Sequence, residues 1–315
     1  MNIQPTIITQ QLSRRFGNTL AVDQLTFDVA PGEIFGLLGH NGAGKTTTIR
    51  LLNGVLTPSA GGARVLDFDP ALQGPALRRH TGVLTETPAL DERLTGRENL
   101  TMYGRLYGLK GAELEARVAE LLAIFELSDW ADERAGSYSK GMKQRLALAR
   151  LLVHDPAVLF LDEPTAGLDP LAARHVHELI QQLSQTGQRT IVLCTHNLAE
   201  AEQLCHRVAV LERGRLMALG APAELARSLW QGVRLEIELG GGSRPALLAA
   251  WQGRPGLSEV SWADGVLQLR VSGRDMIPDL VAELVAQGER LYRVTPCQPT
   301  LEDVYFALHG QGVTT

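Results

Sequence analysis

The sequence predicts an α/β fold with a mostly parallel sheet, and three observations support this. Apolar strand-like runs alternate with helical patterns up to about residue 225, the order typical of a parallel sheet covered on both faces. A glycine-rich loop, residues 39–46, lies between one such strand and a helix. A second alternation begins near residue 233, so we expect two domains in the 315 residues, 1–228 and 233–310.

Composition is that of an ordinary globular protein. The chain is 44% hydrophobic and has a net charge of −5, whereas bulk binding to nucleic acid normally needs a basic face, so no nucleic-acid partner is expected. The first 15 residues lack the order of a signal peptide, and no run approaches the roughly 18 apolar residues of a membrane helix. We therefore expect a soluble chain that meets a membrane only through a partner.

The elements of the first domain follow from its apolar patterns. Residues 7–30 carry two strand-like runs around the turn Phe16–Asn18, and residues 61–66 add a short strand, which indicates an antiparallel β subdomain. Helical spacing from Thr95 to about Leu127 indicates a helical insert. Core strands are expected at 34–38, 82–84, 158–161 and 190–194, helices at 45–52, 141–154 and 171–186, and a closing hairpin around 213–214.

The glycine-rich loop is the most specific motif, because residues 39–46 match G-x-x-x-x-G-K-[ST] in full. Its glycines let backbone N–H groups face a polyphosphate without a Cβ in the way. Lys45 can reach the outer phosphates, and the Thr46 hydroxyl can hold Mg²⁺. The motif predicts a nucleoside triphosphate site. Its expected binding residues are Gly39, Asn41, Gly42, Ala43, Gly44, Lys45, Thr46 and Thr47.

Acidic and histidine side chains follow two other predicted strands. Asp162 ends an apolar strand and can bind Mg²⁺, while its neighbour Glu163 points differently and can act as a general base toward water. His196 follows the strand that ends at Thr195 and can contact a γ-phosphate. An acidic strand end or a lone histidine is often only structural. Because the carboxyl ends of parallel strands share one edge, these side chains can meet the phosphate loop there.

A second anion site is suggested by residues 138–142, Tyr-Ser-Lys-Gly-Met, at the start of a predicted helix. Ser139 offers a hydroxyl, Gly141 leaves the backbone accessible, and the first N–H groups of a helix attract anions. Taken alone, the stretch is better explained as an ordinary helix cap.

Together these motifs resemble those of ABC (ATP-binding cassette) nucleotide-binding subunits over about Ile7–Leu225. The resemblance implies a P-loop NTPase (ABC ATPase) core in which Glu163 is the catalytic glutamate and His196 the switch histidine. It also implies that Ser139, Lys140 and Gly141 belong to the signature motif, whose helix binds the γ-phosphate held by the other subunit. Two ATP molecules, with Mg²⁺, would then lie between the two subunits of a homodimer.

Further roles also come from the resemblance. Phe16 occupies the position where the family stacks an aromatic ring on adenine, although one aromatic in a turn is commonly plain packing. Asp169 lies in the loop that touches the opposite subunit. Glu86 stands where the family usually has glutamine and could contact Mg²⁺ or water, which makes the expected metal residues Thr46, Asp162 and Glu86.

Two departures from the family pattern distinguish this chain. In the signature, commonly L-S-G-G-Q, Lys140 replaces a glycine and Met142 replaces the glutamine, and in the earlier loop Glu86 replaces glutamine. These variants resemble those of exporter-type subunits encoded separately from their membrane partner.

The second domain shows the order β-α-β-β-α-β, which predicts a small α+β domain of the split-βαβ, ferredoxin-like kind. It has no catalytic cluster. The stretch 299–305 resembles a tail of subunits that serve drug, ion, polysaccharide or lipid-linked export, and by analogy alone the domain is expected to regulate or steady the dimer.

The leading hypothesis is an ATP-hydrolysing subunit of an ABC-2-type exporter. It is expected to be cytoplasmic and peripheral on the inner face of the cell membrane, as a homodimer on a separate transmembrane permease. One alternative is a non-transport ABC ATPase of translation or DNA maintenance, disfavoured by the single cassette and the lack of a long coiled coil. The other is a small-molecule phosphotransferase, which leaves the helix after Ser139 and the Asp162–Glu163 pair unexplained.

Overall fold

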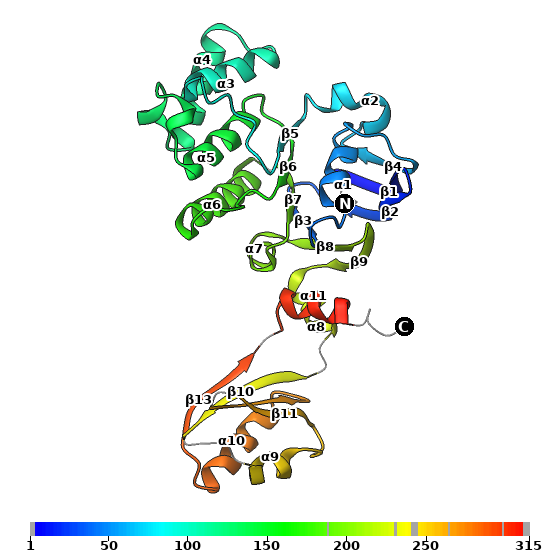
Figure 1. The fold of residues 1–315 in the computed structure, drawn as a ribbon, viewed down its shortest axis with the longest axis vertical. Coiled ribbons are helices and arrows are strands. Elements are labelled where there is room, and N and C mark those ends of the chain that lie inside the picture. The colour runs from blue at the N-terminus through cyan, green and yellow to red at the C-terminus, as the bar shows by residue number, and fades with distance from the viewer. Residues whose placement is uncertain are drawn as a thin grey trace. The chain divides into compact units, whose positions relative to one another are not determined.

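The chain divides into two units, Met1–Pro222 and Ala223–Thr315, each with its own hydrophobic core (Figure 1). The structure is a computed structural model and describes residues 4–187, 189–229, 232–240, 245–263, 265–297 and 299–310.

A six-stranded sheet forms the centre of the first unit. Its order is β5-β6-β7-β3-β8-β9, and every neighbouring pair is parallel except β8 and β9. Strands β3, β6 and β7 are buried along their whole length, which explains their continuous apolar sequences. The strands are β3 (Ile34–Leu38), β5 (Thr81–Leu84), β6 (Val158–Asp162), β7 (Thr190–Thr195), β8 (Arg207–Glu212) and β9 (Arg215–Gly220).

The predicted antiparallel subdomain is confirmed as a second, three-stranded sheet of order β2-β1-β4. It comprises β1 (Ile7–Phe16), β2 (Thr19–Val29) and β4 (Ala60–Val65). Apolar residues of this sheet, such as Ile7 and Phe27, share one core with Phe35 of β3, and the rings of Phe27 and Phe35 stack with centroids 5.1 Å apart. This shared core fixes the subdomain next to the phosphate loop.

Helices surround these sheets. The predicted insert is a pair, α3 (Gly96–Leu106) and α4 (Gly111–Ile124), seen at one end of the unit in Figure 1. Thr95 and Glu98 form a capping box at the start of α3, which explains why the helix begins there. The others are α1 (Lys45–Leu52), α2 (Pro70–Leu77), α5 (Lys140–Leu151), α6 (Pro170–Gly187) and α7 (Leu198–Leu204), with short 3-10 helices at Ser128–Trp130 and Ala135–Ser137.

The sequence did not predict α2 and α7. Both are short and depend on a side-chain cap more than on an apolar stripe. The Asp69 side chain accepts a hydrogen bond from the N–H of Ala71, and the Asn197 side chain accepts one from the N–H of Glu200.

The second unit has the predicted ferredoxin-like arrangement. Its antiparallel sheet has the order β11-β12-β10-β13, and alternate residues of β10, Leu235, Ile237 and Leu239, are buried in the core. α8 (Pro222–Leu229) begins at the boundary between the units, and the elements that follow it are β10 (Val233–Leu239), α9 (Pro245–Trp251), β11 (Leu257–Ala263), β12 (Val266–Val271), α10 (Met276–Ala286), β13 (Leu291–Cys297) and α11 (Leu301–Gly310). Across the described residues of both units, no helix combines the length and apolarity needed to cross a membrane.

We expect Ile237→Ala to destabilise the second unit by about 2–5 kcal/mol, because it leaves a cavity at a fully buried position. The control is Val285→Ala on α10, where the side chain is 58% exposed and a change of about 0.5 kcal/mol or less is expected. Calorimetric unfolding of the full chain measures both. Equal losses in the two variants would contradict the assigned core.

Candidate functional site

The phosphate loop runs from the end of β3 into α1, and packing as well as backbone conformation requires its glycines. Gly44 has φ +105°, a left-handed conformation, and a Cβ there would lie 2.5 Å from the Ala21 carbonyl oxygen. A Cβ at Gly39 would lie 2.5 Å from the carbonyl oxygen of Leu211. The loop is therefore a backbone cradle at these two points, which suits a polyphosphate ligand.

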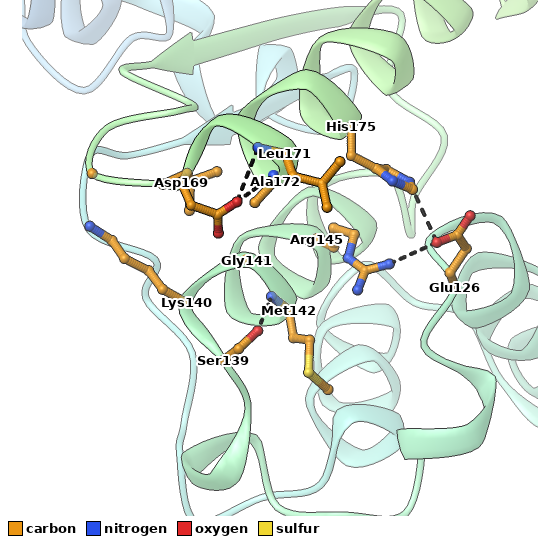
Figure 2. Close-up of a pocket in the computed structure, with 12 residues that line it drawn as sticks. Glu126, Ser139, Lys140, Gly141, Met142, Arg145, Asp169, Leu171, Ala172 and His175 are labelled. Carbon is orange, nitrogen blue, oxygen red and sulfur yellow. Dashed lines mark hydrogen bonds and ion pairs between the residues drawn. The ribbon is translucent and has the colours of Figure 1, made fainter.

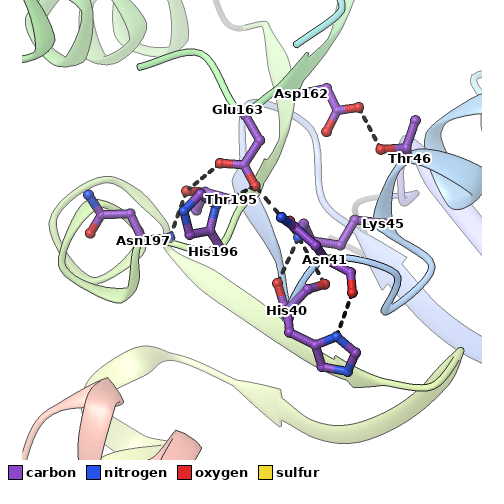
Figure 3. Close-up of polar contacts among 10 residues, drawn as sticks. His40, Asn41, Lys45, Thr46, Asp162, Glu163, Thr195, His196 and Asn197 are labelled. Carbon is purple, nitrogen blue, oxygen red and sulfur yellow. Dashed lines mark hydrogen bonds and ion pairs between the residues drawn. The ribbon is translucent and has the colours of Figure 1, made fainter. Parts of the chain in front are cut away.

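Lys45, the first residue of α1, is only 6% exposed. Its ammonium Nζ donates to the carbonyl oxygens of Gly39, at 2.7 Å, and His40, at 3.3 Å, and lies 3.6 Å from Oε1 of Glu163 (Figure 3). The loop thus holds a positive charge where the outer phosphates of a bound nucleotide would need one.

Thr46 and Asp162 face each other across the same site. The Thr46 hydroxyl donates to Oδ2 of Asp162 at 2.7 Å. Burial raises the pKa of Asp162, the hydrogen bond from Thr46 opposes this, and the charge of Glu163 raises it further. A bound cation would favour the carboxylate form.

The residues present fit Mg²⁺ held jointly with a nucleotide. Within the described part of the chain, no group of three or more His, Cys, Asp or Glu side chains could hold a metal alone. Thr46 and Asp162 would supply only part of an octahedral shell and leave positions for phosphate oxygens and water, which is how Mg²⁺ usually binds.

Glu163 has an unusual backbone. Its φ is +51°, a left-handed conformation that costs a side-chain-bearing residue about 1–2 kcal/mol. His196 Nδ1 lies 2.9 Å from Oε1 of this carboxylate, and the Thr195 hydroxyl lies 3.4 Å from Oε2. The Glu163 side chain lies between Lys45 and His196, as Figure 3 shows.

One cleft of about 430 Å³ contains most of the predicted site residues. Of the binding and catalytic candidates, it is lined by Phe16, Asn41, Gly42, Ala43, Gly44, Lys45, Thr46, Thr47, Glu86, Asp162, Glu163 and His196. Gly39 contributes its carbonyl oxygen to Lys45 from the end of β3.

Phe16 lies in this cleft with 43% of its surface exposed. The guanidinium carbon of Arg14 lies 4.6 Å from the centre of the Phe16 ring, and Arg14 Nη1 also donates to the Thr57 carbonyl at 2.8 Å. A cation over the ring, itself held by the Thr57 carbonyl, restricts the orientation of Phe16 in the cleft.

The remaining candidates, Ser139, Lys140, Gly141 and Asp169, line a different cavity of about 510 Å³ (Figure 2). The Ser139 hydroxyl oxygen caps α5 by accepting from the N–H of Met142, and Asp169 caps α6 by accepting from the N–H groups of Leu171 and Ala172. In one chain, therefore, the signature residues do not lie in the phosphate-loop cleft.

Three further cleft residues, Ala21, His40 and Ala166, were not among the sequence predictions. His40 occupies one of the variable positions of the glycine-rich motif. This position in the sequence could have predicted that it lines the cleft. Its Nδ1 lies 2.7 Å from the Asn41 carbonyl oxygen. Arg14 was also missed, because a contact with Phe16 has no sequence signature.

Comparison with known proteins defines the class. A family model described as ABC transporter matches residues 22–166. The Nod factor export ATP-binding protein I of Paraburkholderia xenovorans is 46% identical over 218 residues, 69% of this chain and 71% of that protein. The chain belongs to the ABC transporter family, as an ATP-binding subunit of the kind that hydrolyses ATP to power transport.

Other relatives extend the match along the chain. The Nod factor export ATP-binding protein I of Rhizobium sp. (strain N33) is 38% identical over 300 residues, 95% of both chains. The daunorubicin/doxorubicin resistance ATP-binding protein DrrA of Streptomyces peucetius is 44% identical over 235 residues, 74% of this chain and 71% of that protein.

Solved structures agree on the fold. The structure of cbiO1 from Clostridium perfringens, part of the ABC transporter complex cbiONQ, superposes with a TM-score of 0.66 at 27% identity, covering 71% of this chain and 94% of that one. An ATP-binding subunit of an ABC transporter superposes with a TM-score of 0.64 at 34% identity, covering 71% and 93%.

Gly44→Ala should weaken ATP binding more than Gly42→Ala does. Both glycines have positive φ, so both substitutions cost about 1–2 kcal/mol in backbone strain. Only at Gly44 would the new Cβ also collide with a carbonyl oxygen, since nothing lies within 4 Å of a Cβ at Gly42. Calorimetric titration with ATP would measure this, and equal affinities in the two variants would contradict the cradle geometry.

Proposed function

We propose that this chain is the ATPase subunit of an ABC-2-type exporter, working as a homodimer around two ATP and Mg²⁺ on a separate transmembrane permease. The observation that carries the proposal is the convergence of a buried lysine, the Thr46–Asp162 pair and the Glu163–His196 pair in one cleft. On this basis the chain is cytoplasmic and meets the inner face of the membrane through the permease.

The phosphate loop would make the main contacts with the phosphates of the nucleotide. Lys45 and the backbone N–H groups of the loop stabilise the phosphates, Thr46 and Asp162 hold Mg²⁺, and the ring of Phe16 stacks on adenine. Glu86 lines the same cleft, and its carboxylate is available to Mg²⁺ or to an ordered water.

For hydrolysis, Glu163 is the group that accepts a proton from the attacking water. The carboxylate is fixed by Lys45 and His196, so it needs no reorganisation at the moment of reaction. His196 faces Glu163 through Nδ1 and keeps Nε2 for a γ-phosphate oxygen. Mg²⁺, when bound, neutralises charge that develops on the phosphate oxygens.

The separation of the two cavities supports a composite site, that is, an ATP site formed by residues of two subunits. Ser139, Lys140 and Gly141 line a cavity at the start of α5, which offers a hydroxyl, an ammonium and free N–H groups to an anion. None of these three residues is among those that line the phosphate-loop cleft. A second copy of the chain, placed head to tail, brings them to that cleft, with Asp169 near the junction.

The exporter assignment follows the relatives. Their names describe Nod factor export and drug resistance, and one of them aligns with nearly the whole chain, including the second domain. The non-transport alternative is not favoured by these relatives. We assign residues 1–228 to the ATPase domain and 233–310 to an accessory domain that steadies or regulates the dimer.

Glu163→Gln should lower turnover by at least about 100-fold, because an amide cannot take a proton from water. ATP affinity should be unchanged, so an ATP-bound dimer should accumulate and be detectable by light scattering. Glu202→Gln, at an exposed carboxyl on α7, is the matched control and should turn over normally. Normal turnover in Glu163→Gln would remove the general-base role.

Ser139→Arg should abolish hydrolysis while leaving ATP binding to the monomer intact, because the bulk and charge block the cavity that is completed only in the dimer. Ser128→Arg adds the same side chain at an exposed position outside that cavity and should be active. Equal activity of the two variants would contradict the composite site.

A further inference from the structure

A buried polar cluster lies beside the catalytic pair and is not explained by nucleotide binding. Glu200 on α7 is only 2% exposed. Its Oε1 lies 2.9 Å from Nε2 of His177 on α6 and accepts a hydrogen bond from the Thr165 hydroxyl at 2.7 Å. The His177 side chain is itself only 13% exposed.

A carboxylate at this depth is costly unless hydrogen bonds compensate. Burial acts to raise the pKa of Glu200, but the polar side chains of His177, Thr195 and Thr165 bring this pKa below its usual value. Oε2 is buried and has no hydrogen-bond partner among the described residues. In this cluster, Oε1 of the Glu200 carboxylate accepts hydrogen bonds from two donors, Thr165 and His177.

The three residues come from segments that also carry the proposed catalytic groups. Thr165 follows Glu163 by two residues, and α7 begins directly after His196 and its cap Asn197. The N–H of Glu200 donates to Asn197 Oδ1, and the N–H of Asn197 donates to the Thr195 hydroxyl. His177 lies on α6, the helix capped by Asp169.

We propose that Glu200 is a positioning residue which, through Thr165 and His177, fixes His196 relative to Glu163 and ties both to the Gly167–Asp169 loop. This inference rests on the proposed function. Because one oxygen serves both donors, a shift of α6 or of the loop after β6 changes a hydrogen bond to α7 directly. The loop that would meet the second subunit is thereby connected to the histidine that would meet the phosphate.

The test separates positioning from nucleotide binding. Thr165→Val removes one donor with little change of shape and should lower kcat of the full chain about tenfold, the size expected for one lost hydrogen bond. The ATP dissociation constant should change less than about twofold, since the cluster does not touch the cleft. Thr9→Val, which removes a buried hydroxyl that bonds to the backbone of Phe27 in the antiparallel sheet, is the control and should keep kcat.

Glu200→Gln supplies the rescue. An amide oxygen in place of Oε1 still accepts from both donors, and the amide nitrogen takes the position of Oε2. We expect kcat within about threefold of wild type for Glu200→Gln and a loss of about tenfold or more for Glu200→Ala. If Glu200→Ala does not fold, Thr165→Val and the rescue variant carry the test.

The positioning role is overturned if Thr165→Val retains wild-type kcat, or if its loss appears equally in Thr9→Val or in ATP affinity. Wild type and Glu163→Gln measured in parallel keep the two proposals apart. Turnover that is lost only in Glu163→Gln leaves the ATPase assignment in place and removes the role of Glu200.

Discussion

The site depends on the parallel pairing of β3, β7 and β6. In this register Leu38 is paired with Thr195, and Asp162 with Cys194, so the three strands end at nearly the same level. At that edge a short segment follows each strand: the phosphate loop, the Asp162–Glu163 turn and the Thr195–His196 turn. Both faces of these strands are buried, so a shift of β6 by one residue would move Asp162 from the edge of the sheet toward the apolar core, which opposes a change in the level of the strand ends.

At this edge of the sheet, side chains of opposite charge lie close together. Two adjacent acids, Asp162 and Glu163, share a small volume with the buried ammonium of Lys45. Thr46 and His196 hydrogen-bond the two carboxylates from opposite sides. Glu163 has a left-handed backbone, and its carboxylate contacts Lys45 and His196, whereas the carboxylate of Asp162 accepts from Thr46.

Much of this was predictable because short motifs have strict local requirements. The spacing from Gly39 to Thr46, the acids after an apolar strand and the β-α-β-β-α-β order each follow from neighbouring residues, and the fold predicted from them is confirmed. What the sequence could not reveal arises between distant residues. The Arg14 contact behind Phe16, the left-handed φ of Glu163 and the convergence of Thr165 and His177 on Glu200 are consequences of packing, which no local pattern encodes. The short α7 was missed because its cap, more than its periodicity, defines it.

The burial of Asp162 has a consequence for the stability of the folded chain. Since its pKa is raised in the folded chain, protonated Asp162 favours the fold at low pH, and that contribution is lost as the pH rises through the raised pKa. At neutral pH the carboxylate therefore lowers the free energy of unfolding of the unliganded chain. ATP that binds the folded form alone raises this free energy by mass action. We therefore expect the resistance of the chain to proteolysis to rise with the concentration of ATP.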